Sequence, residues 1–307
     1  MSISPGLPLT IAVCLKSTQL SSVPLRLDES GRAPRAGDAP SSVNPADLAA
    51  LALALALGAE HGAAQVTALT AGPESWEEPL RLALASGAHR VFRLWQDEWP
   101  VERWEGAQDG SATHTAFMAQ AVAAALAEAP PELVLTGEAS LDNGHGCFGA
   151  FLAQALGATY AHRAVALTRD GAGWRTRVKL ERGYTQEMVL GAPIVLSVSS
   201  GLPRPAYPSL PAWIHGRSAV IPLRGCALRY PVLPGTTLRP PRPRVKQFPL
   251  PDSALDAESR IRALVELPAG GGGQILQAEN DPAAQAAAIV KLLRERGYRT
   301  SPDSQPS

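Results

Sequence analysis

Short apolar runs alternate with helical segments over the first 160 residues, and this alternation constrains the fold more than any other feature. Runs typical of buried strands lie at Thr10–Leu15, Gln65–Thr70, Arg90–Leu94 and Glu132–Gly137. Strands separated by helices are typical of a parallel sheet with helices on both faces. We therefore expect an α/β fold with a Rossmann-like, doubly wound, mostly parallel sheet.

The segments between these strands carry helix signals. Asn44 and Pro45 predict a helix start, because asparagine is a favoured N-cap and proline a favoured first helical residue. The stretch before them, 17–43, is rich in Ser, Pro, Gly and Arg and predicts a long loop. Further helices are expected over 74–86 and 113–128.

The pattern changes after about residue 160. Segments at His162–Leu167, Trp174–Leu180 and Glu187–Leu190 predict a small antiparallel meander, with a turn at Asp170 and Gly171. Pro193–Val198 then resembles another buried strand. The parallel sheet should therefore carry a small antiparallel extension.

The C-terminal part has a different composition. Prolines crowd residues 230–252, four glycines occupy 270–273, and a helix is predicted from Asp281 to about Gly297. We expect an α/β nucleotide-binding domain over 1–228 and an extended proline-rich arm with a C-terminal helix over 229–307. That helix either docks elsewhere, for example on another subunit, or closes its own domain.

Composition excludes several classes of function. The chain has 28 basic and 28 acidic side chains, so no electrostatic footprint for nucleic acid is present. Cys14, Cys147 and Cys226 lie far apart without metal-ligand spacing, so we expect no metal site and no disulfides. The longest apolar run, 48–58, is shorter than the roughly 20 residues needed to span a bilayer. No basic segment precedes the first apolar stretch, so we expect a cytoplasmic protein without membrane insertion.

A glycine-rich loop after the fourth strand is the strongest chemical signal. Gly144, Gly146 and Gly149 form a GxGxxG pattern, but six residues separate Gly144 from Gly137 at the strand end. This spacing disfavours a nicotinamide-binding site. The loop and the following helix N-terminus still suit phosphate oxygens; the alternative is a turn that binds nothing.

Two other features bear on function. His145 and Cys147 lie two residues apart without a third orienting group, so we expect no catalytic residue. Ser199–Ile214 is a proline-rich loop directly after a buried strand, and Leu202 should be exposed near its tip. An exposed leucine on a stiff loop favours docking into a partner, and the alternative is a proline-rich cover strand.

Five segments in this order resemble the β subunit of electron-transfer flavoproteins over about residues 10–225. They are VCLK near the first strand, VNPADLAAL, TALTAGP followed by LALASGAHR, LVLTGEASLD, and APIVLSVSSGLPRPAYPSLPAWI. The resemblance implies a heterodimer whose α subunit holds the redox-active FAD. It further implies an electron carrier, not an enzyme, between a donor dehydrogenase and a quinone oxidoreductase or another acceptor. This chain would hold AMP or a second FAD and would dock the donor through Leu202.

The resemblance also assigns an adenylate site. Its residues would be Cys14, Lys16, Asn44, Ala71, Gly72, Asp142, Asn143, Gly144, His145, Gly146, Cys147, Phe148 and Gly149. Cys147 and Phe148 replace polar residues of the family loop, so main-chain amides should provide most of the phosphate contacts. Two alternatives remain: a stand-alone Rossmann-like nucleotide-binding enzyme, and a nucleotide-free scaffold.

Overall fold

The computed structural model describes residues 9–19, 41–62, 64–99, 112–170, 173–230, 253–265 and 281–295. By its internal contacts the chain divides into two compact units, Met1–Pro241 and Arg242–Ser307. The proline-rich stretch from 231 to 252 lies outside the described residues, and so do the glycines at 270–273. The expected boundary after residue 228 therefore stays a prediction.

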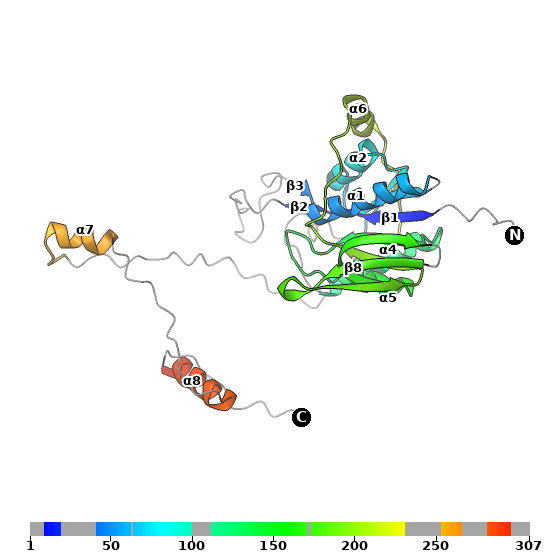
Figure 1. Cartoon of the computed structure of the whole chain (residues 1–307). Coiled ribbons are helices and arrows are strands. Elements are labelled where there is room, and N and C mark those ends of the chain that lie inside the picture. The colour runs from blue at the N-terminus through cyan, green and yellow to red at the C-terminus, as the bar shows by residue number, and fades with distance from the viewer. Residues whose placement is uncertain are drawn as a thin grey trace. The chain divides into compact units, whose positions relative to one another are not determined.

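The first unit is built on a nine-stranded sheet in the order β11-β5-β4-β1-β6-β10-β7-β8-β9. Figure 1 shows β1 and β8 of this sheet. Neighbours are parallel from β11 to β7, while β8 runs antiparallel to both β7 and β9. The predicted doubly wound, mostly parallel sheet with an antiparallel extension is confirmed. The strands are β1 (Thr10–Cys14), β4 (Gln65–Ala71), β5 (Arg90–Leu94), β6 (Leu133–Gly137), β7 (Thr159–Asp170), β8 (Gly173–Lys179), β9 (Thr185–Leu190), β10 (Ile194–Val198) and β11 (Leu223–Arg224).

Helices cover both faces of the parallel part. On one face, Leu51 and Leu80 pack in a hydrophobic cluster with Val13 of β1. On the other face, Val122 and Leu152 pack in a second cluster with strand residues. The helices of this unit are α1 (Pro45–Glu60), α2 (Glu78–Ala85), α4 (Ala112–Ala127), α5 (Phe148–Leu156) and α6 (Leu210–Ser218), with single 3₁₀ turns at Glu74–Trp76 and Glu181–Gly183.

The helix predicted over 74–86 is interrupted. A 3₁₀ turn occupies Glu74–Trp76, and α2 begins only at Glu78, with Pro79 in its first turn. Proline lacks an amide N–H and clashes with a preceding helical turn, so the α-helix starts next to it. Gly87 follows the helix in the left-handed region with φ of 109°.

The loop predicted over 17–43 is partly wrong. Ser17–Gln19 (β2) pairs antiparallel with Ser41–Val43 (β3), and residues 20–40 lie outside the described part. The buried Thr18 donates its hydroxyl proton to the Ser42 carbonyl at 3.1 Å. This small ribbon fixes the entry of the chain into α1.

The second unit contributes two described helices, α7 (Ala257–Val265) and α8 (Pro282–Glu295). Asp281 caps α8 by accepting the Ala283 N–H at 3.0 Å, as its position before Pro282 predicts. Among the described helices, none combines the length and apolar character needed to cross a membrane.

Candidate functional site

A cavity of about 150 Å³ opens at the carboxyl ends of β1, β4 and β6. β1 lies between β4 and β6, and successive strands are added outward on either side, so the strand order reverses at this point. Ligands of open α/β sheets bind in the crevice at such a switch point. The lining residues are Cys14, Leu15, Lys16, Asn44, Asp47, Leu69, Thr70, Ala71, Trp76, His114, Thr115, Met118, Val122, Thr136, Gly137, Glu138, Ala139, Ser140, Asn143, His145, Gly146, Cys147 and Phe148.

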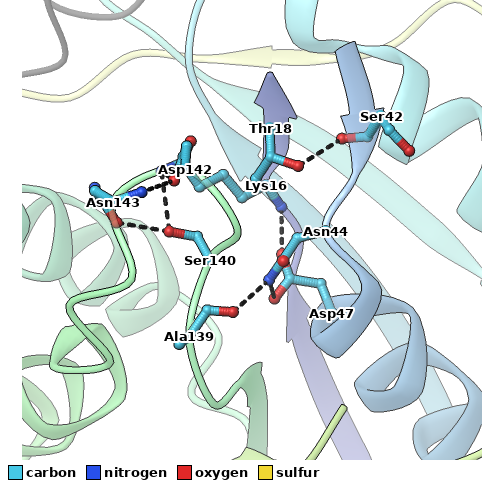
Figure 2. A network of polar contacts seen from close by, with 9 residues as sticks. All are labelled: Lys16, Thr18, Ser42, Asn44, Asp47, Ala139, Ser140, Asp142 and Asn143. Carbon is cyan, nitrogen blue, oxygen red and sulfur yellow. Dashed lines mark hydrogen bonds and ion pairs between the residues drawn. The ribbon is translucent and has the colours of Figure 1, made fainter. Parts of the chain in front are cut away.

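The buried carboxylate of Asp47 joins three elements at the base of the cavity (Figure 2). It accepts hydrogen bonds from the Lys16 N–H at 2.7 Å and the Gly137 N–H at 3.0 Å. Asn44 donates its side-chain amide to the same carboxylate at 3.0 Å and to the Ala139 carbonyl at 2.9 Å. Burial raises the pKa of Asp47 from 3.8 to about 7, although these donors favour the charged form. The Asn44 side chain therefore bonds to groups that line the cavity and does not cap α1.

Lys16 extends toward the loop after β6 and forms an ion pair there. Its Nζ lies 2.8 Å from Asp142 Oδ1 and 3.5 Å from Ser140 Oγ. Burial alone raises the pKa of Asp142, but the Lys16 charge and hydrogen bonds hold it below its ordinary value. Asp142 Oδ2 is buried and has no hydrogen-bond partner among the described residues. Because Asp142 already neutralises Lys16, the cavity carries no free excess of positive charge from this lysine.

The glycines of the loop are required by the backbone. Gly144 and Gly146 have φ of 65° and 62°, a region that residues with a side chain rarely adopt. At Gly149 a Cβ atom would collide with Ser197 Oγ and lie 3.0 Å from the Tyr160 ring. The loop then enters α5, whose start at Phe148 has no side-chain cap. Unbonded amides at a helix start are donors for an anion.

The rest of the lining is largely apolar. Trp76, Met118 and Phe148 supply large side chains, and α4 contributes one wall. The hydroxyl oxygen of Thr70 is buried and has no partner among the described residues. A buried hydroxyl without a partner is rare in folded proteins. Its position on the cavity wall fits a hydrogen bond to a ligand.

The thiols of the cavity differ in burial. Burial, with the nearby Asp47 carboxylate, raises the pKa of the Cys14 thiol, so this group stays neutral. Cys147 is half-buried at the start of α5. His145 is exposed in the same loop. In the described part of the chain, no side-chain hydrogen bond joins His145 to Cys147 or joins either of them to a third group.

The structure brings most of the predicted site residues together. Those that line the cavity are Cys14, Lys16, Asn44, Ala71, Asn143, His145, Gly146, Cys147 and Phe148. Gly72, Asp142, Gly144 and Gly149 are not part of the lining; the first three lie in adjoining turns, and Gly149 lies in the first turn of α5. At Gly72 a Cβ atom would lie 2.6 Å from the Trp76 ring, so this glycine lets Trp76 reach the wall.

Sequence reasoning missed several lining residues. By sequence, Asp47 is a favourable charge in the first turn of a helix, and Thr70 is the end of a strand; neither pattern indicates a cavity. His114, Thr115, Met118 and Val122 come from α4 and carry no local signal, because their place depends on how that helix packs.

The expected exposure of Leu202 is wrong. Leu202 is half-buried and packs against the hydrophobic cluster that includes Ala164 and Val198, and its N–H donates to the Ser199 carbonyl at 3.2 Å in a tight turn. The exposed apolar side chains of this region follow it, at Tyr207, Leu210 and Ile214.

The doubly wound sheet with a cavity at its switch point defines the class of Rossmann-like α/β proteins. Within that class, the sequence model of the electron transfer flavoprotein domain matches residues 36–221. The chain belongs to the electron transfer flavoprotein family and, within it, to the β-subunit group.

Individual relatives agree with this assignment. Protein FixA of Azorhizobium caulinodans is 33% identical over 147 residues, which cover 48% of this chain and 50% of the relative. The electron transfer flavoprotein subunit beta of Bacillus subtilis is 25% identical over 257 residues, covering 82% of this chain and 85% of the relative. The corresponding subunit of Clostridium acetobutylicum is 30% identical over 204 residues, covering 66% and 73%. The chain thus spans about half the length of the FixA relative.

Proposed function

We propose that this chain is the β subunit of a heterodimeric electron-transfer flavoprotein and holds an adenosine nucleotide, AMP or a second FAD, in the cavity at the switch point. The partner is an α subunit that holds the redox-active FAD. Electrons pass from a donor dehydrogenase through that FAD to a quinone oxidoreductase or another acceptor. The chain acts in the cytoplasm and contributes binding and orientation, without a catalytic residue of its own.

The observation that carries this proposal is the buried hydroxyl of Thr70, which has no hydrogen-bond partner among the described residues, in a cavity that also borders a glycine loop and a helix start. Main-chain amides around Gly146 and the start of α5 would hold a phosphate. Trp76, Met118 and Phe148 would contact the base, and Thr70 would donate a hydrogen bond. Lys16 would offset the phosphate charge in competition with Asp142.

Docking of the donor dehydrogenase is assigned to the loop after β10. Leu202 remains the proposed docking residue, although its side chain is half-buried. The exposed Tyr207 and Leu210 extend the same surface. Enrichment of tyrosine at interface hot spots supports a contact there.

The test is to purify the full chain with a candidate α subunit, record the visible spectrum, and then heat-denature the complex and analyse the supernatant. We expect flavin absorbance and release of AMP, or of FAD in excess of one per heterodimer. A complex without flavin contradicts the carrier role. A flavin-containing complex that releases no nucleotide beyond the α-subunit FAD supports the carrier role but contradicts the adenylate site.

A further inference from the structure

The loop after β10 is attached at its start to the side chain of Glu138 and, through the Ser199 N–H, to the Ala164 carbonyl at 2.9 Å. Glu138 Oε1 accepts the Ser200 N–H at 2.8 Å and the Ser200 hydroxyl at 2.7 Å. The Ser199 hydroxyl lies 3.4 Å from the same oxygen. Three donors from two consecutive residues therefore converge on one carboxylate oxygen, so the position of Glu138 determines where the loop leaves the sheet.

The second oxygen of Glu138 faces Arg163. The Arg163 Nε lies 3.4 Å from Glu138 Oε2, and its Nη1 lies 3.1 Å from Glu181 Oε1. Burial raises the pKa of Glu138, but the Ser200 hydrogen bonds and the Arg163 charge outweigh it and hold the pKa below its ordinary value.

Arg163 adopts an unusual backbone conformation. Its φ is 60°, in the left-handed region that is unfavourable for a residue with a Cβ atom. The strand pairing around it is irregular on both sides, since the register shifts against β10 and against β8. Strain of this kind persists where the surrounding structure requires it and is a reason to look for a functional constraint.

Glu138 also belongs to the cavity. It lines the cavity directly after β6, between Gly137, which donates to Asp47, and Ala139, which accepts from Asn44. The main chain on both sides of Glu138 is thus fixed by the cavity network, while its side chain holds the loop. The residue contacts both features, and its negative charge would be repelled by an anionic phosphate in the same cavity.

We propose that Glu138 is a positioning residue that couples occupation of the cavity to the backbone of the loop after β10, with Arg163 as its counter-charge. An anionic adenylate in the cavity repels the Glu138 carboxylate, so the Arg163 ion pair and the Ser200 hydrogen bonds contribute more to stabilising that charge. Binding therefore orders the loop at Ser199–Leu202. The donor-docking loop then differs between the occupied and the empty chain. The inference rests on the proposed adenylate site for its ligand.

The test is hydrogen–deuterium exchange of the full chain with and without saturating AMP, and in a parallel arm FAD, with affinity measured by calorimetry. We expect the ligand to slow exchange of the peptide that begins at Ser199 by about fivefold, the factor set by one hydrogen bond of ordinary net strength. Glu138→Ala should abolish this response while AMP still binds, and binds more tightly, because the carboxylate that repels the phosphate is gone. Glu138→Gln should restore part of it, because the amide oxygen accepts the Ser200 N–H.

Two further variants separate positioning from general stability. Arg163→Gly relieves the backbone strain, so it should fold at least as well as the unchanged chain, yet it should weaken the loop response. Glu187→Gln, an exposed change on β9, serves as the matched control and should respond as the unchanged chain does.

The outcomes are distinguishable. Binding without a change in exchange at the loop overturns the coupling and leaves the adenylate site standing. A full response in Glu138→Ala or Arg163→Gly likewise overturns it. If neither AMP nor FAD binds the unchanged chain, the adenylate site is contradicted, and the coupling is contradicted with it.

Discussion

At the scale of single residues, the cavity combines a carboxylate that is expensive to ionise with a hydroxyl that has no hydrogen-bond partner in the described part of the chain. Asp47 is buried, and its three donors come from the segment after β1, the residue before α1 and the end of β6. Thr70 has no described partner at all. Variants of both residues test whether the cavity is a binding site or only a structural turn.

Asp47 should make stability depend on pH. Its folded-state pKa is raised from 3.8 to about 7, so its contribution to stability is full below the lower value and is lost as pH rises toward the higher. Between about pH 5 and about pH 8 the loss should be roughly 3 kcal/mol. Asp47→Asn cannot ionise, so urea unfolding at both pH values should show a smaller decrease for this variant. Equal decreases in the two proteins would show that Asp47 is ionised throughout.

Thr70→Val should affect stability and binding in opposite directions. The change keeps the shape and removes a buried hydroxyl without a partner, which is a desolvation cost of about 1–3 kcal/mol. We expect a higher midpoint of urea unfolding together with a weaker affinity for AMP in calorimetry. Thr67→Val, on the same strand but outside this cavity, is the control and should leave AMP affinity unchanged. Unchanged affinity in Thr70→Val would remove this residue from the site.

At the scale of elements, a buried ion network attaches α2 to the sheet and to α6. Glu77 accepts from Arg93 Nε at 2.9 Å and from Arg81 Nη2 at 2.9 Å. Arg81 also donates to the carbonyls of Arg217 and Ala219 at 2.8 and 2.7 Å. The end of α6, and with it the exposed surface after the loop, depends on this network.

Glu77→Ala should be strongly destabilising. It leaves the buried Arg93 guanidinium without its counter-charge, and breaking such a pair costs about 3 kcal/mol. Glu78→Ala, an exposed neighbour, is the matched control and should change stability by no more than about 0.5 kcal/mol. Denaturant unfolding of both variants gives the comparison; similar losses in the two would show that removal of a negative charge at the start of α2, not the ion network, determines the effect.

Elements were predicted best where a local signal sets them. β5 matches its predicted bounds, and Asn44-Pro45 and Asp281-Pro282 mark the starts of α1 and α8. Predictions were less accurate where distant contacts decide. The ribbon of Ser17–Gln19 with Ser41–Val43 has no local pattern, because each strand has only three residues and exists through its partner.

At the scale of the molecule, all described residues that line the cavity lie within the first unit. A chain shortened after Pro241 should therefore keep its thermal midpoint and its AMP affinity. A chain shortened after Leu228 should unfold at a lower temperature, because it loses Tyr230. That side chain lies 2.9 Å from His114 Nδ1 and stacks edge-on against Phe117 with ring centroids 5.0 Å apart. Equal midpoints for the two lengths would place the domain boundary at 228, as the sequence predicts.

The sequence by itself determined the doubly wound architecture, the glycine loop after the fourth predicted strand and the family, because strand and helix periodicity, turn residues and segment order are local properties of the chain. The tertiary structure alone decided that Asp47 ties Lys16 to Gly137, that α4 forms a cavity wall, and that Leu202 turns inward. Each of these depends on residues far apart in sequence that meet only when the sheet is assembled. The raised pKa of Asp47 results from burial, and the carboxyl group is buried only once the sheet and its helices have assembled.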